Sequence, residues 1–337
     1  MIRDAIAALV EGRDLSEEEA SGCMEQIMAG EATQAQLGAF LVALRMKGET
    51  VDEIVGLARV MRERSLHVEV AGPLLDTCGT GGDASGTFNA STAAALVAAG
   101  AGARVAKHGN RAMSSACGSA DVLEALGVKI DVTPARVAAS IEQAGIGFMF
   151  AQAFHPAMKH VAPVRREIGV RTVFNILGPL TNPAGAQSQV LGAAGAVLAE
   201  KLAGVLRRLG TAHALVVHGE DGLDEVSAAA PTCVYELRDG RVTVSRIDPG
   251  ALGLPLHAPD ALRGGSAGEN AAALRRVLAG EPGPLRDFTL LNAAAALVAG
   301  DLAPDVKEGL ALAAQAIDSG AAQERLDALV RVSNEVA

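Results

Sequence analysis

The sequence is poor in aromatic side chains and in positive charge. It contains no Trp and one Tyr, and its 29 Lys and Arg residues are outnumbered by 39 Asp and Glu residues, which gives a formal net charge of −10. Proteins that bind single-stranded nucleic acid stack bases on aromatic rings, and duplex binding needs broad positive surface. The composition therefore excludes a general nucleic-acid-binding protein.

Disulfide frameworks, signal peptides and membrane spans are also missing. No metal-type or disulfide-type spacing relates the four cysteines, which are Cys23, Cys78, Cys117 and Cys233. The N-terminus has neither the basic start nor the cleavage site of a signal peptide. The longest apolar runs, near residues 93–103 and 293–300, are too short to cross a bilayer. Because free thiols suit a reducing cytosol, we expect a cytoplasmic protein with no membrane partner.

Half of the 337 residues are hydrophobic, which is enough for a large core and suggests two domains. Residues 1–70 show only helical patterns, and three helix starts carry capping boxes, namely Ser16 with Glu19, Thr33 with Gln36 and Thr50 with Glu53. We predict a small all-helical domain over residues 1–70, which helices from about residue 165 to 185 could complete, and a larger domain over residues 71–337.

After Pro73, short apolar runs alternate with helical patterns. The strand candidates are residues 74–76, 104–106, 147–150, 190–193 and 214–217, and the helix candidates are residues 89–100, 197–209, a helix starting at Thr133-Pro134, and 270–278, 290–299 and 306–319. A hairpin is predicted for residues 233–237 and 242–247 around Asp239-Gly240. Such alternation predicts the α/β class, with a mostly parallel central sheet flanked by helices.

A polar run at residues 107–121 separates two apolar segments and contains no Leu, Ile, Val or Phe. It carries Lys107, Arg111 and His108 together with glycines and serines. Glycines let the backbone approach a ligand closely, and serine hydroxyls donate to oxygens. We interpret the run as a segment that binds a phosphate and does not pack in the hydrophobic core. The alternative is an ordinary polar loop with solvated charges.

Two further segments suit a phosphate. Gly79-Thr-Gly-Gly-Asp83 directly follows a predicted strand, so successive N–H groups can point at one anion, although its spacing fits neither a Walker A loop nor a dinucleotide fingerprint. Phe88-Asn-Ala-Ser-Thr92 begins an Ala-rich helix with unpaired N–H groups and a positive dipole end. The alternatives are a glycine turn for packing and simple helix capping by Asn or Ser.

An acidic pair, Asp224-Glu225, lies shortly after the strand candidate 214–217. Ligands of α/β sheets gather at the carboxyl ends of strands, and Mg²⁺ is typically held by one or two carboxylates together with phosphate oxygens and waters. We therefore interpret Asp224 and Glu225 as Mg²⁺ ligands, direct or through water. The alternative is a solvated acidic turn.

The segment 152–171 offers a site for a carboxylic acid. Arg165 could grip a planar carboxylate in a bidentate fork, or it could form an exposed ion-paired helix face with Arg166 and Glu167. His155 precedes a proline and could simply be part of a turn. Residues 175–183 contain two proline steps and are interpreted as a rigid connector.

Taken in order, these segments resemble the anthranilate phosphoribosyltransferases, which are nucleoside phosphorylase-like phosphoribosyltransferases. The matching blocks are Gly79-Thr-Gly-Gly-Asp83, Asn89-Ala-Ser-Thr92, Lys107-His-Gly-Asn-Arg111, Ser114-Ser115, Gly118-Ser-Ala-Asp121, Val164-Arg-Arg-Glu167, Asn175-Ile-Leu-Gly-Pro-Leu-Thr-Asn-Pro183 and Asp221-Gly-Leu-Asp-Glu225. The helical ends fit as well, so the resemblance covers essentially the whole chain. It implies a homodimeric, Mg²⁺-dependent enzyme of tryptophan biosynthesis that transfers phosphoribose from 5-phosphoribosyl diphosphate to the amine of anthranilate.

The resemblance also implies three sets of site residues. Donor contacts would come from Gly79, Gly82, Asp83, Thr87, Asn89, Ser91, Thr92, Lys107, Gly109, Asn110, Arg111, Ser114, Ser115 and Ser119. The anthranilate site would comprise Gly79, Asn110, His155 and Arg165. The Mg²⁺ ligands would be Ser91, Asp224 and Glu225. Two departures from the family pattern are Ala116-Cys117, where many members have Lys and a small polar residue, and Met158, where many members have an aromatic residue.

The residues are also compatible with two other functions. A pyrimidine nucleoside phosphorylase would share the helical domain and the glycine-rich phosphate loop, but it would need no Mg²⁺. A non-catalytic homologue would bind phosphoribosyl compounds as a regulatory or RNA-associated module. Asp224, Glu225 and Arg165 favour the transferase. No dedicated general base is expected, because the aromatic amine of anthranilate is neutral at pH 7.

Overall fold

The computed structural model describes residues 1–83, 85–112 and 116–335. The chain begins with a bundle of four helices, α1 (Ile2–Val10), α2 (Glu17–Met28), α3 (Gln34–Lys47) and α4 (Val51–Glu63). The three predicted capping boxes are confirmed at the starts of α2, α3 and α4. The apolar faces of these helices pack against one another because each helix alone would leave its stripe exposed.

The predicted α/β domain contains one seven-stranded sheet in the order β3-β2-β1-β4-β5-β6-β7. Its strands are β1 (Leu75–Gly79), β2 (Val105–Gly109), β3 (Ile146–Phe150), β4 (Ser188–Gly192), β5 (His213–Gly219), β6 (Thr232–Arg238) and β7 (Arg241–Ile247). The first five pair in parallel, whereas β6 and β7 form the predicted antiparallel hairpin. Asp239 and Gly240 both have positive φ, as a tight hairpin turn requires.

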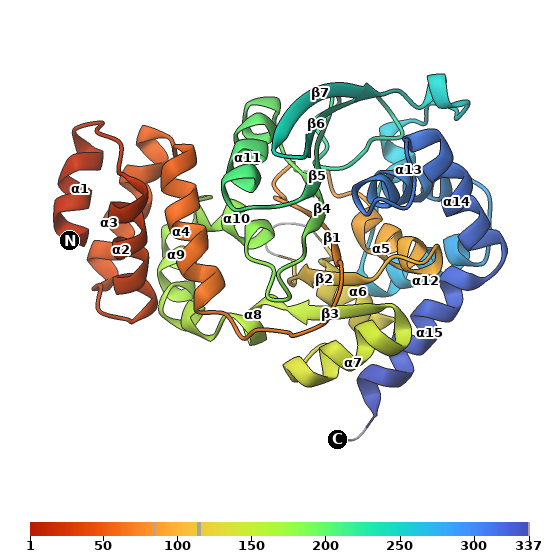
Figure 1. Cartoon of the computed structure of the whole chain (residues 1–337), viewed down its shortest axis with the longest axis horizontal. Coiled ribbons are helices and arrows are strands. Elements are labelled where there is room, and N and C mark those ends of the chain that lie inside the picture. The colour runs from red at the N-terminus through yellow and green to blue at the C-terminus, as the bar shows by residue number, and fades with distance from the viewer. Residues whose placement is uncertain (84, 113–115, 336–337) are drawn as a thin grey trace.

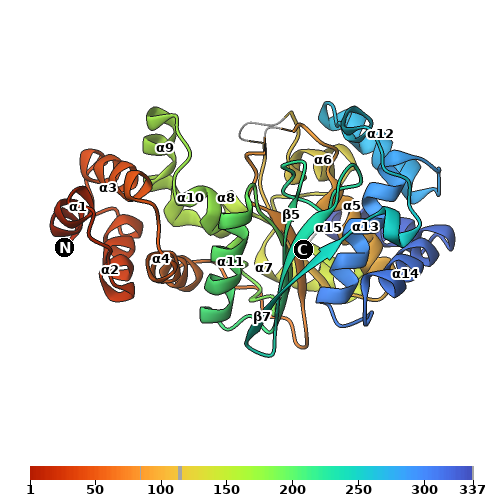
Figure 2. The same ribbon diagram turned by 90° about the horizontal axis from the view of Figure 1, so that it is seen from above.

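The helices cover both faces of the sheet, as predicted, and Figures 1 and 2 show them on either side of the strands. Val190 and Leu215 face a core shared with the C-terminal helices, whereas the alternate residues Leu191 and Val216 face a core shared with the N-terminal bundle. The first face carries α5 (Ala90–Gly100), α12 (Ala267–Leu278), α13 (Pro284–Ala299), α14 (Val306–Asp318) and α15 (Ala321–Asn334).

On the other face, α11 (Ala196–Arg208) lies between the sheet and the bundle (Figure 2). The short helices α8 (Ala151–Phe154), α9 (Ala162–Ile168) and α10 (Phe174–Leu177) lie between β3 and β4 in the chain. Val164 of α9 and Leu177 of α10 are buried in the same core as the bundle. The division of the chain at residue 70 stays a prediction.

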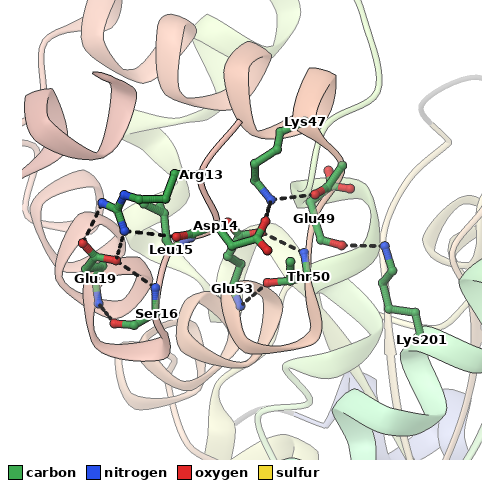
Figure 3. A network of polar contacts seen from close by, with 11 residues as sticks. Arg13, Asp14, Leu15, Ser16, Glu19, Lys47, Glu49, Thr50, Glu53 and Lys201 are labelled. Carbon is green, nitrogen blue, oxygen red and sulfur yellow. Dashed lines mark hydrogen bonds and ion pairs between the residues drawn. The ribbon is translucent and has the colours of Figure 1, made fainter. Parts of the chain in front are cut away.

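A polar network braces the bundle against α11 (Figure 3). The buried Glu53 carboxylate accepts hydrogen bonds from the Leu15 and Thr50 amides, at 2.9 and 2.8 Å, and from Lys47. Lys201 of α11 donates to the Glu49 carbonyl next to this network. The loop between α3 and α4 is therefore tied to the larger part of the molecule.

Several elements differ from the sequence prediction. Helices α6 (Ser119–Ala125) and α15 were not predicted, α7 (Pro134–Ala144) starts where predicted, and α13 begins six residues earlier than residue 290. Four short 3₁₀ segments complete the fold, at Pro156–His160, Gly178–Leu180, Gly250–Leu252 and Pro259–Leu262. No helix in the described part of the chain is long and apolar enough to span a membrane.

Candidate active site

The glycine loop begins where β1 ends, at the reversal point of the strand order. Strands β2 and β4 lie on either side of β1, so the chain leaves β1 and β4 in opposite directions along the sheet. Ligands of such sheets bind at this point, beyond the carboxyl ends of the strands. The Gly81 amide donates to the Asp224 carboxylate at 2.6 Å, and the Thr80 amide donates to the Gly192 carbonyl at 2.9 Å. The loop is thereby connected to β4 and to the segment after β5.

Asp224 is wedged between the ends of β1 and β4. A Cβ atom on Gly79 would lie 2.3 Å from the Asp224 carboxylate, and one on Gly192 would lie 1.5 Å from its carbonyl oxygen. Only glycine at both positions allows this approach. Asp224 is 8% exposed, so the alternative of a solvated acidic turn is wrong.

Negative charges crowd this edge of the sheet. Burial, and then the charge of Asp83, raise the pKa of Asp224 to about 7. Burial, and then the charge of Asp224, raise the pKa of Glu225 to about 8, although the positive charge of Lys107 opposes this shift. Carboxylates that resist ionisation in isolation are stabilised when a cation joins them.

The N-terminus of α5 points its amides toward the same edge. The N-cap residue Asn89 makes no side-chain cap hydrogen bond, so the alternative of simple capping by Asn is wrong. Its side chain instead donates to the Cys117 carbonyl and accepts from Asn270 at 2.8 Å. The first-turn amides of α5 already have acceptors: the Ala90 amide donates to the Phe88 carbonyl, and the Thr92 and Ala93 amides donate to the Asn89 carbonyl. The Ser91 amide donates to the Glu225 carboxylate, so the helix start already faces a negative charge. Thr92, by contrast, is fully buried in the helix.

Lys107 lies in the interior of the sheet. It belongs to β2, is 2% exposed, and donates to the Thr77 carbonyl beneath Ser91, whose Oγ is 3.4 Å away. Burial lowers the pKa of Lys107, while the negative charge of buried Asp76 opposes the shift. The prediction that residues 107–121 fill no core is therefore wrong for Lys107 and His108, because β2 extends through both.

Asp121, in the first turn of α6, connects the described residues on either side of residues 113–115. This carboxylate accepts from the amides of Ala112 and Gly118 and from Arg111. Arg111 is also paired with Glu124 at 2.8 Å, so its charge is already balanced by two carboxylates. The Ser119 hydroxyl donates to the Asn110 carbonyl at 3.3 Å, next to Gly109 at the end of β2. The predicted residues Ser114 and Ser115 lie outside the described part of the chain.

Arg165 is a partly buried cation on α9. Its guanidinium lies 5.6 Å from the centre of the Phe174 ring, and burial, followed by repulsion from Arg171, lowers its pKa. No ion pair joins Arg165, Arg166 or Glu167 to another residue within the described ranges, so an ion-paired helix face is not supported. Because no described carboxylate neutralises Arg165, its surroundings favour a ligand with a negatively charged group.

Two neutral histidines lie behind the end of β2. The rings of His108 and His155 are 5.1 Å apart, and His108 Nδ1 lies 3.2 Å from the Gly178 carbonyl of the connector. Burial lowers the pKa of His108 to about 3 and that of His155 to about 4. The Nε2 atoms of both rings are buried and have no partner among the residues that the structure describes.

The residues fit a divalent cation that is shared with a ligand. No three His, Cys, Asp or Glu side chains form a metal site within residues 1–83, 85–112 and 116–335. The raised pKa values of Asp224 and Glu225 nevertheless mark a place where positive charge is missing. Mg²⁺ commonly binds through one or two carboxylates and completes its coordination with phosphate oxygens and water.

Sequence reasoning missed four residues that shape the site. Gly192 makes room for Asp224, Asn270 holds Asn89, Arg171 binds the glycine loop, and Asn182 donates to buried Asp76 at 2.7 Å. Gly192 could have been found as a glycine at the end of a predicted strand. Nothing local distinguishes the other three, because each acts through contacts distant in the sequence. Thr87 forms a β-bridge with Arg263 at the rim.

Comparison with known proteins supports one family throughout. The helical bundle domain of a glycosyl transferase family matches residues 3–65, and the a/b domain of a glycosyl transferase family matches residues 71–323. The anthranilate phosphoribosyltransferase of Chloroflexus aurantiacus is 60% identical over 334 residues, 98% of each chain.

Two solved structures agree with this match. The Thermus thermophilus anthranilate phosphoribosyltransferase superposes with a TM-score of 0.93 at 48% identity, over 98% of this chain and 100% of that chain. The Saccharomyces cerevisiae enzyme, in complex with PRPP and Mg, gives a TM-score of 0.92 at 28% identity, over 99% and 98% of the two chains. The chain therefore belongs to the anthranilate phosphoribosyltransferases, a family of glycosyl transferases, as its sequence blocks predicted.

Proposed function

We propose that this chain transfers the phosphoribosyl group of 5-phosphoribosyl diphosphate to the amine of anthranilate. The products are N-(5-phosphoribosyl)anthranilate and diphosphate, in the second step of tryptophan biosynthesis from chorismate. The observation that carries the proposal is the convergence of the glycine loop, the α5 N-terminus and the acidic pair Asp224-Glu225 at one edge of the sheet. A sugar diphosphate with a bound divalent cation complements all three.

The donor binds where main-chain amides and buried charge meet. Gly79, Gly82 and Asp83 provide the loop, Asn89, Ser91 and Thr92 the helix start, and Thr87, Gly109, Asn110 and Ser119 the rim. Lys107 acts from beneath as a buried positive charge. Arg111 would reach a phosphate only by exchanging its present carboxylate partners. Ser114 and Ser115 stay predicted contacts of the same loop.

Ser91, Asp224 and Glu225 would hold Mg²⁺, which would supply neutralising charge to the diphosphate. Burial and the neighbouring carboxylate charges raise the pKa values of Asp224 and Glu225, and a bound cation would oppose this shift. Asp83, which contributes to the shift of Asp224, is positioned to stabilise positive charge that develops on the ribose.

The acceptor site combines Arg165 with Gly79, Asn110 and His155. The guanidinium binds the anthranilate carboxylate, and neutral His155 adds no positive charge next to the amine. The nitrogen lone pair forms the bond to C1 as the bond from C1 to the diphosphate oxygen breaks, and the nitrogen then loses one proton to water. Alignment of two bound reactants can contribute about 7–11 kcal/mol to lowering the barrier.

We further propose that the chain acts as a homodimer in the cytoplasm. Val42 and Met46 are one turn apart on α3, and their side chains are 37% and 83% exposed. Large apolar side chains that gather on one face favour association with a partner. The thiol state of Cys23, Cys78 and Cys233 agrees with a reducing compartment.

The loss of anthranilate fluorescence tests the reaction. Purified protein should consume anthranilate only when both 5-phosphoribosyl diphosphate and Mg²⁺ are present. Arg165→Ala should raise the KM for anthranilate by about 10-fold or more, because a charge-assisted hydrogen bond is lost, and should change the KM for the donor little. Arg166→Ala, on the exposed side of α9, is the matched control.

An unchanged anthranilate KM in Arg165→Ala would contradict the placement of the acceptor. Phosphorolysis of a pyrimidine nucleoside without Mg²⁺, in the absence of anthranilate turnover, would contradict the proposed reaction itself.

A further inference from the structure

Arg171 binds the glycine loop from the side of the acceptor segment. It lies between α9 and α10, six residues after Arg165, and its Nη2 donates to two consecutive carbonyls, Thr80 O at 2.9 Å and Gly81 O at 2.8 Å. No ion pair neutralises its guanidinium within the described residues. The Arg171 guanidinium thus makes its hydrogen bonds to the backbone of the loop that is predicted to bind the phosphoribosyl donor.

This arrangement fixes the direction of the loop amides. In a trans peptide the C=O and the N–H point in opposite directions. Carbonyls of Thr80 and Gly81 that face Arg171 therefore turn the amides of Gly81 and Gly82 away from it. The Gly81 amide reaches Asp224 at 2.6 Å, whereas the Gly82 amide donates to no residue that the structure describes. Successive amides that face one side form a site for an anion.

The contact also explains why residue 82 is glycine. Its φ is +88°, and a Cβ atom there would lie 2.0 Å from Nη1 of Arg171 and 2.2 Å from the central carbon of the guanidinium. The guanidinium lies close to the Gly82 main chain, so a side chain at residue 82 would displace it, and the positive φ there favours glycine as well. The conformation of the glycine loop and the position of the Arg171 guanidinium therefore depend on each other.

We propose that Arg171 is a positioning residue for donor binding, which holds the glycine loop in the orientation that directs the Gly82 amide toward diphosphate oxygens while the Gly81 amide binds Asp224. The inference deepens the proposed function and rests on it. Arg171 does not need to touch the substrate. Because residues 165–171 carry both Arg165 and Arg171, one segment contributes a residue to the acceptor site and also contacts the donor loop.

Arg171→Met and Arg171→Lys test the role, with Arg166→Met as a neighbouring control that removes an equal charge. The probes are magnesium diphosphate, titrated by calorimetry, and steady-state kinetics with each substrate. Arg171→Met should raise the Kd for magnesium diphosphate and the KM for the donor by about 10- to 100-fold, as expected for lost charged hydrogen bonds. The KM for anthranilate and the Tm should change little, and Arg171→Lys should recover part of the loss.

Unchanged donor KM and diphosphate Kd in Arg171→Met would overturn the proposal. Equal losses for both substrates with a lowered Tm would also overturn it, because they would indicate a general structural role. A wild-type chain without anthranilate turnover would instead overturn the proposed function, and the diphosphate titration would still decide the amide orientation.

The pair Gly82→Ala and Arg171→Ala adds an independent measurement. In the Arg171→Ala background the added methyl group has space, so the combined effect on donor KM should be smaller than the product of the single effects. Independent, multiplicative effects would contradict the proposed match between the loop and the arginine.

Discussion

Single residues at this site act through charges that are compensated inside the protein. Lys107 and Asp76 lie on adjacent strands, both are buried, and each shifts the pKa of the other toward the charged form. The side chain that the sequence suggested as a phosphate ligand therefore also stabilises the sheet beneath the ligand. Its two roles can be separated by variants.

Lys107→Met should lower the free energy of unfolding by about 3–5 kcal/mol, because it leaves Asp76 without a compensating charge. The double variant Asp76→Asn with Lys107→Met should recover much of this loss, since neither charge is then buried alone. Urea unfolding gives both values. Only the donor KM of the double variant reports on phosphate binding, and a single variant with wild-type stability would contradict the compensation.

His155 should make the protein sensitive to acid. Its pKa is about 4 in the folded protein, below its ordinary value of 6.5. Folding is therefore unaffected above pH 6.5, and stability is lost as the pH falls from 6.5 toward 4, where only the unfolded chain is protonated. His155→Asn should reduce the slope of stability against pH by about 1.4 kcal/mol per pH unit in this window.

The control for this measurement is His67→Asn, because His67 is exposed. Urea unfolding at a series of pH values gives the slope. If His155→Asn and His67→Asn lost stability with pH as steeply as the wild type, burial of a neutral imidazole would not be a source of the acid sensitivity.

The residues that the sequence singled out lie in distinct local patterns. Asp224 and Glu225 form an acidic pair after a strand candidate, and Gly79 follows another; the structure brings Asp224 against Gly79, while the ligand contacts of these residues and of Arg165 stay predictions. Lys107 and Arg171 could not be placed, since the burial of one depends on the pairing of β1 with β2 and the target of the other is 90 residues away in the sequence.

At the scale of elements, Glu53 joins three parts of the bundle. Its carboxylate serves the capping box of α4 and also binds the Leu15 amide and Lys47 (Figure 3). Glu53→Gln should lower the free energy of unfolding by about 2–3 kcal/mol, because an amide group cannot accept all of these bonds. Gln36→Ala, in the capping box of α3, should cost only about 1 kcal/mol.

Thermal or urea unfolding measures both variants. Equal losses in Glu53→Gln and Gln36→Ala would show that Glu53 acts only as a capping residue, and would contradict its role in joining the helices.

Helix and strand limits could be predicted where a side chain marks them. Thr50 and Thr133 mark starts and were found, whereas α15 begins after Gly320 in the left-handed region and offers no capping side chain. Strand β2 was predicted too short, because Lys107 and His108 are polar although both are buried. A strand is predicted too short from the sequence when its last residues are polar and are buried all the same.

At the scale of the whole molecule, the exposed apolar face of α3 predicts the assembly. Replacing Val42 and Met46 together by Glu should convert the proposed homodimer into a monomer, because two charges would enter the proposed apolar interface. Val197→Glu, on α11 and 79% exposed, is the matched control and should leave the dimer intact. Sedimentation equilibrium distinguishes these outcomes, and a dimer that survives both glutamates would place the interface elsewhere.

The mostly parallel sheet and its flanking helices followed from the alternation of strand and helix patterns, whereas the order of the strands was not predicted. The position of the bundle relative to the sheet did not follow either, because α11 and the short helices α9 and α10 connect the two through contacts of residues more than 100 positions apart. Figure 1 shows α10 and α11 between the bundle and the strands.

Calorimetric titration of 5-phosphoribosyl diphosphate tests the central claim, which is that main-chain amides and the carboxylates of Asp224 and Glu225 bind this donor together with a divalent cation. In the presence of Mg²⁺ the wild-type protein should bind the donor, whereas Asp224→Asn with Glu225→Gln should bind it weakly. With the metal chelated, the wild type should lose most of its affinity. Donor binding of equal strength with and without Mg²⁺ would contradict the account.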